Sequence, residues 1–152
     1  MTEPDTNPRD LILDVFTRIV RNAADLRCTG LSPAEAAFCR VMWLEASVDN
    51  GGFPAFFGGS HGDFASETLD ALSRIGASDT ASLLRDAMAL FGPNGPSRDP
   101  VTRNQELSRF RPPARAKLSE LDEAFYSQEE KLDQLKLDFL RSAGLLAPGP
   151  AT

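Results

Sequence analysis

The side chains best suited to metal binding and nucleophilic chemistry are scarce in this sequence. Its 152 residues include one histidine, two cysteines, one tryptophan and one tyrosine. A protein-bound metal ion usually needs three or four ligands, and Cys28 and Cys39 do not form a CxxC pair. We therefore expect two buried, reduced thiols, no metal and no cofactor. A disulfide or a metal site is the weaker alternative.

Long apolar segments and strand-like patterns are also missing. Every apolar run is far shorter than the roughly 20 residues that a helix needs to cross a bilayer. The first ten residues are polar and acidic, unlike a secretory signal. We therefore expect a cytoplasmic protein without a membrane partner. No stretch alternates apolar and polar residues as a strand does, so we expect no sheet.

What the sequence does contain is a series of apolar residues at helical spacing, interrupted by glycine and proline. The pattern predicts one compact all-α domain over residues 9–143, with six to eight helices in orthogonal or bundle-like packing and flexible tails at 1–8 and 144–152. The first helix is expected over residues 9–27. Ser32 with Glu35, and Ser127 with Glu130, have the spacing of capping boxes, and Asp63 is expected to cap the helix after it.

The stretch SVDNGGFPAFFGG, residues 47–59, places three phenylalanines among glycines. Asn50 or Gly51 is expected to adopt a left-handed conformation and to end the central helix, which begins at residue 32. The three rings of Phe53, Phe56 and Phe57 then either anchor this corner in the core or form an exposed patch for a partner. We expect the first arrangement, because large aromatic side chains are usually buried.

Charge is unevenly distributed along this chain, whose net charge is −6. Residues 44–90 contain seven acidic and two basic residues, whereas residues 98–118 contain six basic and two acidic ones. Either these blocks are solvated helix faces that neutralise one another, or one acidic face attracts a basic partner. The basic block has Phe110 among its arginines, but the pI near 4.8 and the lack of a nucleic-acid-binding motif argue against direct nucleic-acid binding.

A catalytic interpretation depends on the loop SHGD, residues 60–63. His61 and Asp63 could form an acid–base pair, but no GxSxG, P-loop or HExxH motif accompanies them. A lone loop histidine is usually a solvated side chain. We therefore expect no enzyme, and keep a small enzyme built on His61 and Asp63 as the less favoured alternative.

The order of these elements resembles the C-terminal-domain family of the bacterial DNA-mimic protein, a family of small helical proteins. The corner carries much of the resemblance, through Asn50, Gly51, Gly52, Phe53, Phe56 and Phe57. Further matching residues are Val48, Ala71, Leu72, Ile75, Gly76, Ala77, Leu121, Asp122, Phe125, Leu132 and Phe139. The match covers roughly residues 33–143.

The resemblance implies an all-helical fold, no known catalytic activity and a homodimer. It also implies an acidic surface that imitates the phosphate backbone of DNA and so occupies a basic, DNA-binding protein. The carboxylates that would form such a face here are Glu45, Asp49, Asp63, Glu67, Asp70, Asp79 and Asp86. The main hypothesis is thus a non-enzymatic protein-interaction domain. An immunity-type or other regulatory binding protein without DNA mimicry is the alternative.

Overall fold

The computed structural model describes residues 7–23 and 28–146, and these residues form seven α-helices, one 3-10 helix and no strand. The elements are α1 (Pro8–Asn22), α2 (Pro33–Gly58), η1 (Ser60–Phe64), α3 (Ala65–Arg74), α4 (Ser78–Ala89), α5 (Pro100–Ser108), α6 (Pro112–Tyr126) and α7 (Glu129–Ser142). The all-α prediction is confirmed. None of these helices combines the length and apolarity needed to cross a bilayer.

The ends of the predicted domain are only partly described. Helix α1 begins at Pro8 and ends at Asn22, where the sequence predicted residues 9–27. Ala23 is extended, which contradicts the prediction at that residue, and the rest of the predicted helix, residues 24–27, lies outside the described residues. Most of the two predicted tails, residues 1–6 and 147–152, also lie outside them.

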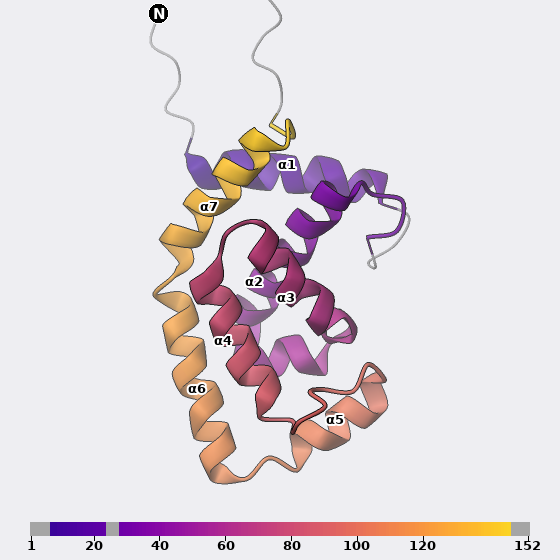
Figure 1. The fold of residues 1–152 in the computed structure, drawn as a ribbon, viewed down its shortest axis with the longest axis vertical. Helices are drawn as coiled ribbons and strands as arrows, with labels where there is room; N and C mark the ends of the chain where they lie inside the picture. Colours follow the sequence, from indigo (N-terminus) through magenta and orange to yellow (C-terminus); the bar gives the residue numbers. More distant parts are fainter. Residues whose placement is uncertain (1–6, 24–27, 147–152) are drawn as a thin grey trace, which may run out of the picture.

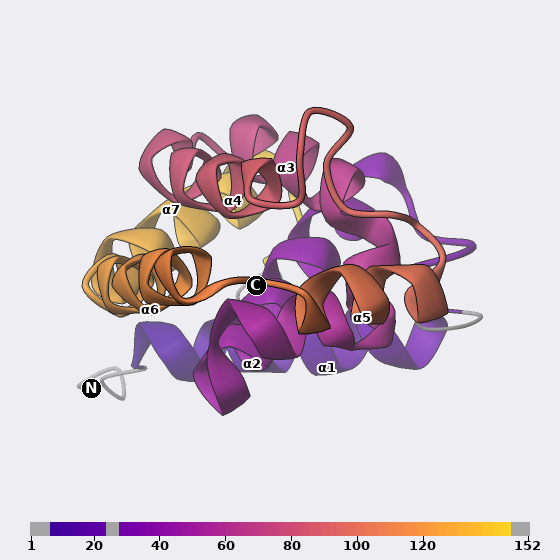
Figure 2. The same cartoon turned by 90° about the horizontal axis from the view of Figure 1, so that it is seen from below.

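Helix α2 passes through the middle of the molecule, and the other helices pack around it (Figure 1). Helices α3 and α4 form an antiparallel pair on one side of α2, while α6 and α7 follow one another along an edge (Figures 1 and 2). Helix α1 crosses the end of the molecule and packs on α2 and α7. One apolar cluster therefore joins α2, α3, α4 and α6, and a second joins α1, the first half of α2 and α7.

The corner predicted after the central helix is a break inside α2. Backbone angles leave the helical region at Gly51 (φ −164°) and Gly52 (φ 75°, ψ −175°). The sequence predicted a left-handed conformation at Asn50 or Gly51. In the structure the left-handed φ falls on Gly52. Glycine is needed at position 52 for two reasons. Residues with a side chain rarely adopt this positive φ, and a Cβ at Gly52 would lie 2.4 Å from Oδ2 of Asp122.

Helix α6 supplies hydrogen bonds to both sides of this break. The backbone N–H of Phe53 donates to Oδ1 of Asp122 at 2.8 Å, and the hydroxyl of Tyr126 donates to the carbonyl of Val48 at 3.0 Å. Asp122 and Tyr126 are four residues apart, so they lie on one face of α6. The kinked helix leaves backbone groups without helical partners, and these two side chains satisfy one group on each side.

The aromatic residues of the corner are anchors, as predicted. Phe53, Phe56 and Phe57 each have an exposed fraction of 0%. The Phe57 ring packs edge-to-face against Phe56, with centroids 5.3 Å apart, and against Phe91 at 4.9 Å. The three rings therefore fill the main apolar cluster, and the corner offers no exposed aromatic patch.

Arg103 fastens α5 to this corner. Its guanidinium is fully buried and donates to the backbone carbonyls of Phe57, Gly59, Ser97 and Arg98 and to Oδ1 of Asp63. All three nitrogen atoms take part, so the buried charge is both paired and hydrogen-bonded. Gly62 makes room for it, because a Cβ there would lie 2.8 Å from Nε of Arg103.

The predicted helix caps agree with the structure at only one position. The Ser32 hydroxyl accepts from the N–H of Glu35 and the Glu35 carboxylate accepts from the N–H of Ser32, which confirms this capping box. The prediction for Asp63 is wrong, since its side chain binds Arg103 and α3 begins without a side-chain cap. The Ser127 prediction is also wrong: its hydroxyl donates to the carbonyl of Ala124.

Candidate functional site

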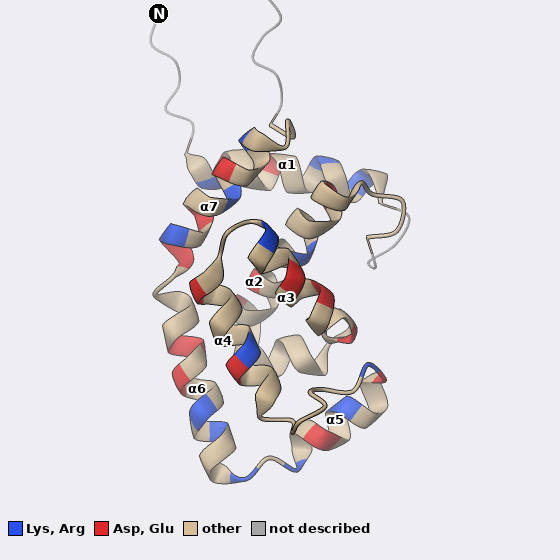
Figure 3. Ribbon diagram, viewed as in Figure 1, with Lys and Arg blue, Asp and Glu red and all other residues tan. Residues whose placement is uncertain are grey.

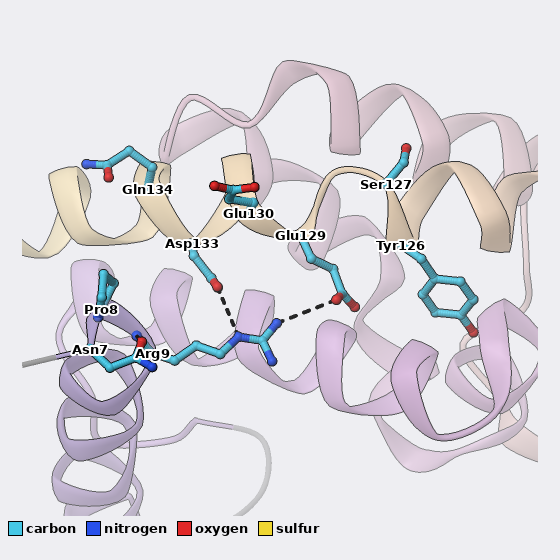
Figure 4. A pocket seen from close by; sticks show the side chains of 9 residues that line it. All are labelled: Asn7, Pro8, Arg9, Tyr126, Ser127, Glu129, Glu130, Asp133 and Gln134. Carbon is cyan, nitrogen blue, oxygen red and sulfur yellow. Dashed lines mark hydrogen bonds and ion pairs between the residues drawn. The ribbon is translucent and has the colours of Figure 1, made fainter.

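A hollow of about 570 Å³ lies where the N-terminus of α1 meets the junction of α6 and α7 (Figure 4). It is lined by Asn7, Pro8, Arg9, Tyr126, Ser127, Glu129, Glu130, Asp133 and Gln134. A smaller adjoining hollow of about 180 Å³ shares Arg9 and Asp133 and reaches Glu45 and Asp49 of α2. We call Glu45, Asp49, Glu129, Glu130 and Asp133 the acidic cluster.

Arg9 crosses from α1 to the carboxylates of α7. Its Nε lies 3.1 Å from Oδ2 of Asp133, and its NH2 nitrogen lies 3.5 Å from Oε2 of Glu129 (Figure 4). The Arg9 side chain remains 54% exposed, so water screens these pairs. Asp133 raises the pKa of Arg9 through a hydrogen bond and its negative charge. The geometry shows that the acidic cluster accepts a guanidinium group.

Lys136 neutralises the inner side of the acidic cluster. Its Nζ lies 2.6 Å from Oε1 of Glu45 and 3.1 Å from Oδ1 of Asp133, and its side chain is only 1% exposed. Burial raises the pKa of Glu45, while the charge of Lys136 opposes that rise. Glu45 is therefore part of an interior ion pair. The prediction that it belongs to an exposed acidic face is incorrect.

Asp49 and Glu129 form a pair of neighbouring carboxyl groups. A hydrogen bond that the protonated Glu129 donates to Asp49, together with burial and the negative charge of Asp49, raises the pKa of Glu129 to about 7. Two carboxylates so close repel each other unless one proton is shared between them. Near neutral pH, Glu129 thus changes its charge with small changes in pH. A cation placed beside it would favour the fully ionised form.

The remaining predicted acids lie on η1, α3 and α4, where several are already paired. Asp63 binds Arg103 at 2.7 Å, Glu67 binds Arg98 at 2.6 Å and Asp79 binds Lys131 at 2.6 Å. Asp70 and Asp86 are exposed and make no ion pair within the described residues. Acidic segments appear on both α3 and α4, and each of these helices also carries a basic segment (Figure 3). The seven acids therefore do not form one continuous face.

His61 and Asp63 have different partners. The His61 ring stacks on Trp43, with centroids 4.4 Å apart, and burial lowers its pKa, opposed by the charge of Asp63. Asp63 accepts its hydrogen bond from Arg103. Within the described residues, no group of three or more His, Cys, Asp and Glu side chains could hold a metal ion. Cys28 and Cys39 are both buried, as predicted.

Arg9, Glu129, Asp133 and Lys136 were not among the residues predicted to form a site, and Glu130 was expected only as the capping-box partner of Ser127. One signal was present in the sequence. Lys136 lies four residues after Leu132 and four before Leu140, within the column of α7 that faces the core. A lysine in an apolar helical column usually has a buried carboxylate partner. Arg9 carries no comparable local signal.

Comparison with known proteins settles the family. The family model described as "DMP19-like protein" matches residues 29–143, which is most of the chain. The protein belongs to the DMP19-like family. No curated protein and no solved structure matches the sequence.

The DMP19-like region includes α2 to α7 and begins after α1. The acidic cluster thus lies entirely within the family region, whereas Arg9 comes from the segment before it. The corner residues Asn50, Gly51, Gly52, Phe53, Phe56 and Phe57 also lie inside the region. In this DMP19-like protein their role is structural, since they form and anchor the break in α2.

Proposed function

We propose that this DMP19-like protein is a non-catalytic interaction domain that binds a basic, DNA-binding protein in the way that DNA would. The observation that carries the proposal is the contact of Arg9 with Glu129 and Asp133. A guanidinium is the group with which many proteins hold DNA phosphates. The carboxylates Asp49 and Glu130 lie at the same site and remain exposed, so they are available to further cations.

Charge at the rest of the surface supports the same partner. Asp70 and Asp86, on α3 and α4, make no ion pair within the described residues and would add to the negative potential. Negative surfaces speed association with basic proteins and weaken in salt, as DNA itself does. A homodimer, which the family resemblance implies, would present two such surfaces.

A second candidate function is an immunity-type or other regulatory binding protein that does not imitate DNA. The pairing of Asp63, Glu67 and Asp79 with internal cations favours it. A DNA imitator needs carboxylates in a series along its surface, and these three already have partners. In this case the acidic cluster would still bind a basic protein, but the partner would have no affinity for DNA.

The test begins with affinity capture of partners from the native host, identified by mass spectrometry. Each captured protein is then bound to a fluorescent DNA duplex, and the domain is added at increasing salt. The proposal expects displacement of the duplex that weakens as salt rises. A captured partner that does not bind DNA would support the regulatory alternative.

A matched pair of variants assigns the binding to the acidic cluster. Glu129→Gln with Glu130→Gln removes two carboxyl groups from α7, and Glu120→Gln with Glu123→Gln removes two from exposed positions of α6. We expect the α7 pair to lose displacement and the α6 pair to retain it. Equal loss in both would mean that only the net charge matters, and the site assignment would fail.

A further inference from the structure

The basic residues of the segment 98–118, which we call the basic segment, fall into two groups in the fold. Arg98 and Arg103 are used internally, by Glu67 and by the corner of α2. Arg109, Arg111, Arg115 and Lys117 are exposed around the connection between α5 and α6. Figure 3 shows Lys and Arg segments gathered along this connection and the start of α6. The acidic cluster, beside α1, lies toward the other end of the molecule (Figure 1).

The exposed part of this basic segment is poorly neutralised. Arg109 and Arg111 make no ion pair within the described residues. Lys117 lies 3.7 Å from Glu120, and both side chains are largely exposed, so water screens this pair. Arg115 donates through Nε to the carbonyl of Phe110 at 3.1 Å, and its side chain is otherwise exposed.

A groove of about 450 Å³ opens beside these cations, between the second half of α2, α5 and α6. Pro54, Leu107, Phe110 and Leu118 supply its apolar surface, while Arg115 and Ser119 lie along α6. This volume falls in the range of binding clefts, and an apolar floor with a few polar groups is their usual composition. Asp122 also lines the groove, but its Oδ1 is occupied by the N–H of Phe53.

We propose that this groove binds an acidic amphipathic helix of a partner protein. The apolar floor would accept one or two large apolar side chains at i, i+4 spacing, and Arg115, with Arg111 and Arg109 nearby, would meet the carboxylates beside them. The charge of the rim selects an acidic segment over a basic one. The groove therefore serves a different partner from the acidic cluster, and the inference does not depend on the proposed function.

The structure favours a peptide over a nucleic acid at this place. The ring of Phe110 already packs edge-to-face against Phe91, with centroids 4.8 Å apart, and is half-buried. A base would need an exposed aromatic face on which to stack.

The experiment uses the full chain and a set of fluorescent peptides of about twelve residues. Each peptide carries leucine or phenylalanine anchors at i, i+4 spacing among glutamates, and a matched set replaces every glutamate with lysine. A single-stranded DNA oligonucleotide of mixed sequence is the third probe. We expect saturable binding of acidic peptides, with weak or no binding of the lysine set and of the oligonucleotide.

Variants locate the binding. Ser119→Trp fills the groove from an exposed position, and Arg115→Glu reverses the charge at its edge; each should weaken acidic-peptide binding by about tenfold or more. Arg115→Lys keeps the charge and should bind within about threefold of the parent. Arg85→Glu makes the same reversal on α4, which contributes no residue to the groove, and should have little effect.

Three outcomes would overturn the proposal. The first is that no acidic peptide binds the folded protein. The second is that Ser119→Trp and Arg115→Glu bind the acidic peptides as the parent does, or that Arg85→Glu weakens them equally. The third is that the oligonucleotide binds and is lost in the same variants, which would assign the groove to nucleic acid. Circular dichroism confirms that each variant is folded.

Discussion

At the α2 corner, single side chains form hydrogen bonds with backbone groups that would otherwise be unsatisfied, and Arg103 forms the largest number of these bonds. Four carbonyls and one carboxylate converge on its guanidinium. A lysine in its place has only three donors on one nitrogen, which cannot point in all these directions. The corner, η1 and α5 thus depend on one side chain.

We therefore expect Arg103→Lys to lower the free energy of unfolding by about 3 kcal/mol or more, because buried acceptors lose their donors. The control is Arg98→Lys, whose side chain is 64% exposed and should change stability by less than about 1 kcal/mol. Urea denaturation followed by circular dichroism measures both. A small loss of free energy of unfolding for Arg103→Lys would mean that the corner does not depend on the guanidinium.

Gly52 is required both by its positive φ and by its closeness to Asp122, and a comparison with a second glycine separates these two effects. Both Gly52 and Gly92 have a left-handed φ, but a Cβ at Gly92 would meet nothing within 4 Å. We expect Gly92→Ala to cost about 1–2 kcal/mol from backbone strain alone. Gly52→Ala should cost more, because its Cβ also collides with Asp122. Equal losses in thermal or urea denaturation would show that the contact with Asp122 is unimportant.

At the scale of whole elements, α7 depends on the ion pair between Lys136 and Glu45. Removing one partner leaves a buried charge, so Lys136→Met alone should cost about 3–5 kcal/mol. Replacing both, as Glu45→Met with Lys136→Met, should restore most of that loss, since apolar side chains suit this interior. Urea denaturation measures the series. A double variant as unstable as the single one would contradict the pairing.

The contact of α1 with the acidic cluster makes a second prediction at this scale. Because Arg9 occupies the carboxylates of Glu129 and Asp133, Arg9→Gln should strengthen the binding of a basic partner several-fold. Stability should change by less than about 1 kcal/mol, because the side chain is largely exposed. Displacement titrations with the captured partner measure the effect. Weaker binding would mean that Arg9 itself contacts the partner.

The sequence predicted the helices well, because periodicity and glycine or proline stops are local signals. The Ser32–Glu35 capping box was predictable for the same reason, since both partners lie within one turn. The Asp63 cap was not, because its oxygen binds an arginine 40 positions away in the chain. Acidic residues were visible in the sequence, but their partners were not: Glu45 meets Lys136 only once α2 and α7 pack together.

For the molecule as a whole, the raised pKa of Glu129 makes the free energy of unfolding depend on pH. The pKa of Glu129 is raised from 4.5 to about 7, so the folded state holds the proton of this carboxyl group more tightly than the unfolded chain does. Its contribution to the free energy of unfolding is therefore largest below about pH 4.5 and is lost as pH rises to about 7. Arg9 opposes this shift, while Glu45 adds to it.

We expect Glu129→Gln to remove this dependence, so that the difference in stability between parent and variant changes between about pH 4.5 and 7 and is constant above. The variant must be compared with the parent because His61 also titrates. Since its pKa is lowered from 6.5, His61 makes the free energy of unfolding rise with pH below that value, which opposes the effect of Glu129. Glu130→Gln, at the neighbouring exposed position, is the control. Urea midpoints across this range test the prediction, and parallel curves for parent and Glu129→Gln would refute the raised pKa of Glu129.

The two hydrogen bonds from α6 to the break in α2 have a consequence for biosynthesis. Phe53 and Asp122 are 69 residues apart, and Val48 and Tyr126 are 78 apart. A nascent chain therefore leaves the ribosome with α2 complete in sequence but with its bend still open to water. The bend can close only after Tyr126 has emerged from the exit tunnel, so native packing must be completed late in translation or after release.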